Sequence, residues 1–187
     1  DLEQVINETI PTLQKIKETG KVRFVGITGL PLAVFRKVID RVPAGSIDSI
    51  LSYCHYSLND SSLESYFDYF EERGIGIINA SPTGMGLLVD RAAPEWHPAP
   101  EEIIDTCKKA VAHCKSKGQD IVELAMQYAV AETRITTTLT STANPENIIK
   151  NINYIEKPMD TELLAEVLEI LEPIHNLSWP SGLAENS

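Results

Sequence analysis

The spacing of apolar residues changes repeatedly along the chain, and these changes predict the order of its elements. Short apolar runs rich in β-branched residues, typical of strands, occur at residues 21–28, 48–57, 75–78 and 134–141. Apolar residues three and four apart, typical of amphipathic helices, occur at residues 2–17, 31–41, 60–73, 101–117, 120–132, 145–155 and 160–171. The pattern therefore predicts a helix, four rounds of strand and helix, and an added helix.

Residues that start, bend or stop helices support these boundaries. Pro11 predicts a kink in the first helix, and Gly20 is typical of the position that follows a helix end. Asn144, followed by Pro145, predicts one helix start, and Asp160, followed by Thr161 and Glu162, predicts another.

Strands that alternate with helices predict an α/β fold with a parallel sheet, because a parallel connection needs a crossover. Four such strands with no closing partner would expose two sheet edges. Either the chain forms a small open sheet, or it is the second half of a (β/α)8 TIM barrel, with covering helices and an extra C-terminal helix. The opening helix, which precedes any strand, favours the half barrel. We therefore treat residues 1–187 as a single domain, an incomplete barrel whose N-terminal half is missing.

Composition narrows the function classes. The chain has a net charge of −11 and no cluster of Lys or Arg, which argues against nucleic acid and anionic membrane surfaces as partners. No apolar run reaches the roughly 18 residues of a membrane helix. Cys54, Cys107 and Cys114 form no CxxC pair and are expected to be reduced, which predicts a cytoplasmic protein.

Candidate binding residues follow the predicted strands. Small and hydroxyl residues come after the third strand, and Ser141 and Thr142 stand just before a helix start, where free N–H groups favour an anion. A phosphate site is one interpretation; a tight turn and ordinary strand propensity are the other. The positions that we single out at the four strand ends are Thr28, Tyr53, Ser81, Thr83, Gly84, Ser141 and Thr142.

Other common kinds of site lack support. The sequence has no GxGxxG after a strand, no P-loop, no GxSxG and no metal-ligand spacing, so we predict no metal. His55 and His97 could act in acid–base chemistry, but a single histidine on a strand or loop is more often a structural hydrogen-bonding residue.

Four segments, taken in order, resemble the second half of an aldo-keto reductase barrel: GKVRFVGITG, YCHYSLND, GIGIINASPTGMGLL and STANPENIIKNI. The resemblance implies an oxidoreductase with a nicotinamide cofactor. It assigns Thr28 to the carboxamide of nicotinamide, and Ser81 and Thr83, with Gly84 beside them, to the pyrophosphate. Tyr53 stands where the family commonly has Gln, and Ala80 where it has the Tyr that stacks on nicotinamide. We expect Tyr53 to supply the aromatic surface that Ala80 lacks.

The resemblance also implies which dinucleotide is used. Family members that prefer NADP carry a Lys at the position of Ser141 and an Arg at that of Asn147, and this chain has neither cation. Lys150 is the only cation nearby, and Asn151 matches the Asn that contacts adenine. Because a 2′-phosphate needs cationic partners, we expect NAD rather than NADP.

No residue of this chain inherits a catalytic role, because the family's catalytic residues lie in the first half of the barrel. The resemblance implies that the intact protein is an NAD-dependent sugar dehydrogenase and that this segment supplies its cofactor cradle. Trp96, His97 and Trp179 are candidates to wall the site of a small-molecule sugar. The segment alone is expected to be inactive. A non-catalytic nicotinamide-binding sensor or scaffold module, or a truncated interaction fragment, stays open as an alternative, and the sequence leaves the oligomeric state undetermined.

Overall fold

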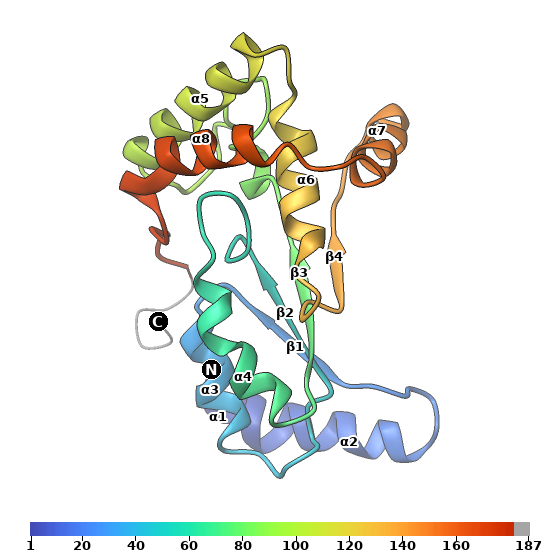
Figure 1. The fold of residues 1–187 in the computed structure, drawn as a ribbon. Coiled ribbons are helices and arrows are strands. Elements are labelled where there is room, and N and C mark those ends of the chain that lie inside the picture. The colour runs from blue at the N-terminus through green and yellow to red at the C-terminus, as the bar shows by residue number, and fades with distance from the viewer. Residues whose placement is uncertain (182–187) are drawn as a thin grey trace.

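A sheet of four parallel strands runs through the computed structural model, which describes residues 1–181 (Figure 1). The strands are β1 (Gly26–Gly29), β2 (Ser49–Tyr53), β3 (Gly76–Ala80) and β4 (Thr137–Leu139), and they pair in the order β1-β2-β3-β4. The predicted α/β fold with four parallel strands is confirmed. The last six residues of the predicted domain, 182–187, lie outside the described residues.

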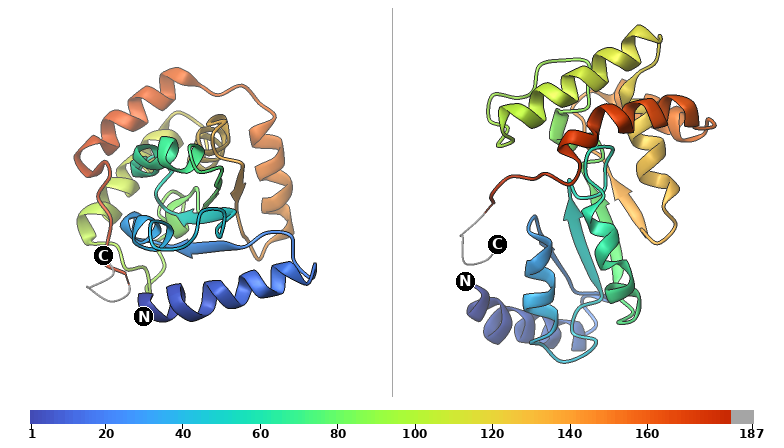
Figure 2. Two further views of the ribbon diagram at one scale, coloured as in Figure 1. Left: turned by 90° about the horizontal axis from the view of Figure 1, so that it is seen from below. Right: turned by 60° about the vertical axis from the view of Figure 1, so that its left-hand side comes forward.

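Helices connect and cover the strands. Seen from below, they form an outer layer around the sheet (Figure 2, left). Their bounds are α1 (Leu2–Gln4), η1 (Val5–Thr9), α2 (Ile10–Glu18), α3 (Leu32–Ile39), η2 (Ser62–Tyr66), α4 (Phe67–Glu71), η3 (Gly84–Gly86), α5 (Glu101–Ser116), α6 (Ile121–Ala131), α7 (Pro145–Ile155), α8 (Thr161–Leu171) and η4 (Glu172–Ile174). None of the helices among residues 1–181 is long and apolar enough to cross a membrane.

The first helix contains an irregular turn where a kink was expected. η1 is a π-helical turn directly before α2, and Pro11 stands at the second residue of α2. Proline has no N–H to donate to the preceding turn and its ring crowds the carbonyl four residues earlier, so a wider turn relieves the clash. The distortion predicted from Pro11 is therefore present as a π-helical turn.

Three strands are shorter than their apolar runs predicted. β1 begins at Gly26 rather than at residue 21, because its partner β2 begins only at Ser49, which pairs with Gly26. β2 ends at Tyr53 rather than at residue 57, because Cys54 turns the backbone into the left-handed region with φ 64°. At the sheet edge, β4 pairs only over Thr137–Leu139 instead of the predicted 134–141. β propensity extends further along the chain than the available partner strand does.

The helices match the predictions best where a side chain caps the start. Asp120 accepts a hydrogen bond from Val122 N, Asn144 from Glu146 N, and Asp160 from Leu163 N. The exception is the predicted helix at 60–73, which forms a 3-10 turn, η2, followed by the short α4. There, polar side chains bind the neighbouring backbone, as short polar residues do in competition with helix hydrogen bonds.

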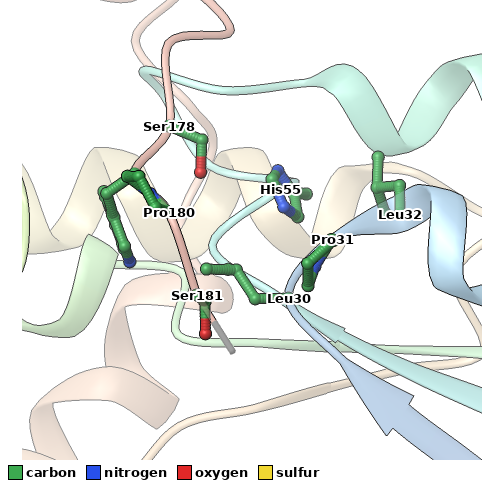
Figure 3. A pocket seen from close by; sticks show the side chains of 8 residues that line it. Leu30, Pro31, Leu32, His55, Ser178, Pro180 and Ser181 are labelled. Carbon is green, nitrogen blue, oxygen red and sulfur yellow. The ribbon is translucent and has the colours of Figure 1, made fainter. Parts of the chain in front are cut away.

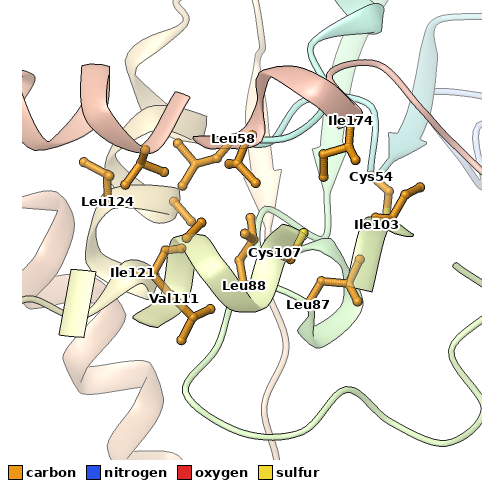
Figure 4. Packing of buried hydrophobic residues seen from close by; sticks show 14 of the residues in the cluster. Cys54, Leu58, Leu87, Leu88, Ile103, Cys107, Val111, Ile121, Leu124 and Ile174 are labelled. Carbon is orange, nitrogen blue, oxygen red and sulfur yellow. The ribbon is translucent and has the colours of Figure 1, made fainter. Parts of the chain in front are cut away.

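Two apolar clusters lie at opposite ends of the strands. The amino-end cluster packs Phe35, Phe67 and Phe70 of the helices against Ile50 and Ile77 of the sheet. The carboxyl-end cluster gathers residues of α5, α6, α8 and the loops that follow the strands (Figure 4). In Figure 1, α5 and α8 accordingly lie beyond the carboxyl ends of the strands, and α1 and α2 beyond the amino ends.

The three cysteines are buried and unpaired, as expected for reduced thiols. Burial raises the pKa of Cys54 and of Cys107 to about 12. Both side chains belong to the carboxyl-end cluster, where they pack as small apolar groups.

Candidate functional site at the carboxyl ends of the strands

The two faces of the sheet differ, and the predicted nicotinamide residues share one face. Ile50 and Ile77 are buried against the helices. Residues one position further along each strand point to the opposite face and are only half-buried, including Tyr53 at the end of β2. Thr28 lies on this open face too, and its hydroxyl donates to Leu51 O at 3.1 Å.

Tyr53 and Ala80 are register partners on adjacent strands. Residues paired in this way project from the same side of a sheet, with neighbouring strands about 4.8 Å apart. The side chain of Ala80 ends at its methyl group, and Tyr53 is the half-buried aromatic residue beside it, packed against the edge of the carboxyl-end cluster. This arrangement fits the expectation that Tyr53 provides an aromatic surface beside Ala80, which stays a prediction.

Most backbone N–H groups of the turn from Ser81 to Gly86 already donate to backbone carbonyls. Ser81 N donates to Leu139 O at 3.2 Å, Gly84 N to Ser81 O at 2.9 Å, and Gly86 N to Thr83 O at 3.1 Å. Ser81 and Gly84 adopt positive φ, which folds the turn back on the strand. The structure thus leaves fewer amides for a pyrophosphate than the sequence suggested, and the hydroxyls of Ser81 and Thr83 become the principal candidate donors.

The backbone N–H groups at the start of α7 also have hydrogen-bond partners within the chain. Pro145 has no N–H, Glu146 N is bound by the Asn144 side chain, and Asn147 N donates to Asn144 O at 3.1 Å. The expectation of free N–H groups at this helix start is therefore wrong, because the Asn144 cap uses them. Thr142 accepts from Asn144 N and from Asn147 Nδ2, which leaves the Thr142 hydroxyl proton available to an acceptor.

The candidate residues in and just before α7 differ in how far their side chains are exposed. Ser141 and Asn147 are exposed, as is Lys150, whereas Asn151 is buried at 9% exposure. Thr142 and Asn147 are thus joined by a hydrogen bond of 3.1 Å, and Lys150 lies one helical turn from that pair. Neutral side chains dominate the start of this helix.

The three predicted substrate-loop residues lie together. The His97 ring stacks on Trp96 at 5.9 Å and meets Trp179 edge to face at 5.0 Å. Ala99 N donates to His97 Nδ1, so His97 Nε2 carries the proton and donates to Gly84 O at 3.0 Å. Burial lowers the pKa of His97 and keeps the ring neutral. Nε2 therefore holds the loop to the Ser81–Gly86 turn, while Nδ1 braces the loop's own backbone at Ala99. Of the three rings, only that of Trp96, 69% exposed, is free.

One group at this edge of the sheet went unassigned from the sequence. His55 is buried, and its Nδ1 lies 3.0 Å from Asp60 Oδ2 and 3.0 Å from Ser62 Oγ. The sequence showed His55 as a lone histidine, because a carboxylate five residues away in an irregular loop has no recognisable spacing. The signal that could have found it is the cluster of polar residues, SLNDSS, directly after an apolar strand.

A C-terminal tail crosses above this histidine and is tied to its loop. Ser61 N donates to Asn176 Oδ1 at 2.8 Å, and Asn176 N donates to Asn59 O at 3.1 Å. His175 Nε2 lies 3.2 Å from Ser61 Oγ. These contacts fix the position of Trp179, which is 8% exposed. Within residues 1–181, no group of three or more His, Cys, Asp or Glu side chains is arranged to hold a metal ion.

The order of the parallel strands and the helices that cover them match one family of known proteins. The model of the aldo/keto reductase family matches residues 1–172, and the chain belongs to this family. A solved member, the aldo-keto reductase AKR11C1 from Bacillus halodurans, superposes with a TM-score of 0.71 at 23% identity, covering 97% of this chain and 58% of its own. The chain therefore forms part of a TIM barrel.

Two curated relatives narrow the comparison. L-galactose dehydrogenase of Arabidopsis thaliana is 50% identical over 99% of this chain and 59% of its own length. D-arabinose 1-dehydrogenase of Saccharomyces cerevisiae is 28% identical over 68% of this chain and 40% of its own length. The chain thus spans less than two thirds of the relatives it matches, which are both sugar dehydrogenases by name.

Proposed function

We propose that this chain is the cofactor-binding part of a cytoplasmic, NAD-dependent sugar dehydrogenase that oxidises L-galactose to its 1,4-lactone, a step of ascorbate biosynthesis. The observation that carries the proposal is the 50% identity to L-galactose dehydrogenase over almost the whole chain. The segments that resemble the plant enzyme are ILSYCHYSLND, PEWHPA, AHCKSKG and WPSG. The family membership supports the nicotinamide cofactor.

The open face of the sheet would hold the nicotinamide end of the cofactor. Thr28 would contact its carboxamide, and the Tyr53 ring, beside the small Ala80, would lie against the nicotinamide ring. An aromatic side chain here both excludes water and fixes the ring plane, and such pairing contributes about 0.5–1.5 kcal/mol beyond the buried area. Tyr53 would thus orient the cofactor without taking part in proton transfer.

The remaining contacts belong to the pyrophosphate and the adenosine. Hydroxyls of Ser81 and Thr83, with the close backbone at Gly84, would hold the pyrophosphate, and the free Thr142 proton points to a further acceptor. Ser141 and Asn147 are neutral where a 2′-phosphate would need cations. Asn151, the buried polar residue of α7, would contact adenine. NAD is therefore the proposed cofactor.

The proposed reaction is a two-electron oxidation that removes a hydride from the anomeric carbon and a proton from its hydroxyl group. A bound NAD+ would supply the acceptor for the hydride of the C1–H bond, and the C1 hydroxyl would release its proton to a base as the lactone carbonyl forms. Residues of this chain position the cofactor and wall the sugar site; the base, a Tyr by family resemblance, would be supplied by the first half of the barrel. The segment alone would therefore be inactive.

The test is oxidation of L-galactose by the intact protein, followed through NADH formation. We expect turnover with NAD+ and at least about tenfold weaker binding of NADP+, since an unpaired phosphate dianion would lose charge-assisted hydrogen bonds. Equal or tighter binding of NADP+ would show that Lys150 or another cation holds the 2′-phosphate.

A second measurement concerns the segment itself. Residues 1–187, expressed alone, should give no detectable NADH from L-galactose at any NAD+ concentration. The intact protein, assayed in parallel, is the control. Turnover by the segment would contradict the assignment of the catalytic groups to the other half of the barrel.

A further inference from the structure

A pocket of about 240 Å³ lies at the carboxyl edge of the sheet, between two segments that are far apart in sequence. One wall comes from Leu30, Pro31 and Leu32, which follow β1, and the other from residues 178–181 of the tail. His55 lies between these walls (Figure 3). The polar side-chain groups of the lining residues are the His55 imidazole, the Trp179 indole N–H and the hydroxyls of Ser178 and Ser181; the other lining side chains are apolar.

The protonation of His55 follows from its neighbours. Ser62 Oγ donates its proton to Asp60 Oδ1 and can therefore only accept from His55. Asp60 Oδ2, a carboxylate oxygen, also accepts. Because both groups that face Nδ1 are acceptors, the ring proton sits on Nδ1, and in the neutral imidazole Nε2 carries a lone pair.

Nε2 has no partner to match this lone pair. It is one of the buried side-chain atoms within residues 1–181 that have no hydrogen-bond partner, and His55 as a whole is 6% exposed. Buried polar atoms are nearly always satisfied, so an orphan atom in a side chain that lines a pocket calls for a donor from outside the chain.

We infer that His55 Nε2 accepts a hydrogen bond from a hydroxyl group of a polyhydroxylated small molecule bound in this pocket. If the proposed function holds, on which the identity of this ligand rests, the hydroxyl belongs to the sugar substrate. Asp60, directly behind the ring, places negative charge in line with the pocket and disfavours an anionic ligand. Serine hydroxyls beside apolar walls suit a molecule with both C–H surfaces and hydroxyl groups. His55 is thus a substrate-binding, specificity-determining residue rather than a base.

The first test is His55→Asn in the intact protein. The Asn side-chain amide can still donate to Asp60 but does not reach the Nε2 position. We expect KM for L-galactose to rise about five- to tenfold, the size of one net hydrogen bond, with kcat and KM for NAD+ nearly unchanged. His55→Gln, whose amide reaches towards the Nε2 position, should recover part of the loss. An unchanged KM in His55→Asn would overturn the inference.

The matched control is His113→Asn. His113 also pairs with a carboxylate, Glu166 at 2.7 Å, but it lies on α5 away from the pocket. This variant should leave KM for L-galactose at the wild-type value. A rise equal to that of His55→Asn would mean that the effect is general, and would overturn the inference.

A binding measurement separates this inference from the proposed function and does not depend on a variant that folds. In intact protein labelled with ¹⁵N at histidine, the Nε2 resonance of His55 should shift on addition of L-galactose and stay unchanged on addition of acetate. A shift without turnover would refute the proposed function and support the hydroxyl site. No shift with L-galactose, or a shift with acetate alone, would overturn the site.

Discussion

The two ends of the sheet satisfy their polar groups differently. At the amino ends, Asp48 accepts from Lys17 Nζ at 2.6 Å and from Val25 N at 2.7 Å, and its own backbone joins the neighbouring strands. In the carboxyl halves of β2 and β3 and just beyond, Ser52 Oγ, Asn79 Oδ1 and His55 Nε2 are buried without partners, the three such atoms within residues 1–181. In (β/α)8 barrels the amino ends serve stability and the carboxyl ends bind ligands, and here the division is visible in the hydrogen bonds themselves.

The amino-end cluster should be the more sensitive to truncation. Phe70 is fully buried and contacts the rings of Phe35, Tyr66 and Tyr69. Phe70→Ala in the intact protein should lower the free energy of unfolding by about 3–5 kcal/mol, because the cavity adds to the lost transfer energy. Denaturant titration measures the change, and NAD+ affinity of the folded variant should not move. The exposed neighbour gives the control: Glu71→Ala should change stability by less than about 0.5 kcal/mol. A loss below about 1 kcal/mol for Phe70→Ala would show that the cluster is dispensable.

Asp48 should make the stability of the amino end depend on pH. Burial raises the pKa of this carboxyl, but the hydrogen bonds from Lys17 and Val25 together hold the pKa below its ordinary value. A lowered pKa in the folded state means that the carboxylate contributes stability above its unfolded pKa and loses it as pH falls through the folded value. Asp48→Asn should cost about 1–2 kcal/mol at pH 7, after allowance for partial exposure of the pair, and less at pH 3.

Thermal or denaturant unfolding at pH 7 and pH 3 measures this difference. Glu3, whose pair with Arg41 is exposed, provides the comparison: Glu3→Gln should leave stability nearly unchanged at both values. If Asp48→Asn destabilised the protein equally at pH 3 and pH 7, the charge of Asp48 would not be the cause.

At the carboxyl end, a change of Tyr53 should affect cofactor binding more than stability, the reverse of what we expect for Phe70. Tyr53→Ala is expected to weaken NAD+ binding up to about tenfold, equivalent to the loss of one aromatic contact, with a small effect on stability because Tyr53 is only half-buried. Tyr53→Phe keeps the ring and should bind NAD+ as the wild type does. Quenching of protein fluorescence by NAD+ measures both affinities. Unchanged affinity in Tyr53→Ala would remove the proposed stacking role.

Much of the fold could be predicted because local signals agree with it. Asp120, Asn144 and Asp160 mark helix starts both in the sequence and in the structure. Strand lengths could not be predicted in the same way, since the extent of β4 depends on where Ala80 ends its pairing. The β propensity of a segment depends on its own residues, whereas the position at which a strand ends also depends on its partner strand.

The candidate site divides along similar lines. Tyr53 and Ala80 could be identified from a motif, and the register then placed them side by side. The satisfied amides at Ser81 and at the start of α7 could not be foreseen, because they depend on Leu139 O and on the orientation of one Asn side chain. The surroundings of His55 depend on Asp60 and Ser62 of its loop and on a tail more than a hundred residues away. The polar run SLNDSS marks the loop, but no local pattern encodes its meeting with the tail.

The hydrogen bonds between Asn176 and the 59–61 segment have a mechanical consequence. Two of them, at 2.8 Å and 3.1 Å, close a ring of chain that spans most of the sequence without a covalent link. A force pulling the tail away from the sheet is borne by these few bonds and by the packing of Trp179 against His97. The wall at Ser178–Ser181 would therefore detach first, and the pocket beside His55 would open while the sheet remained intact.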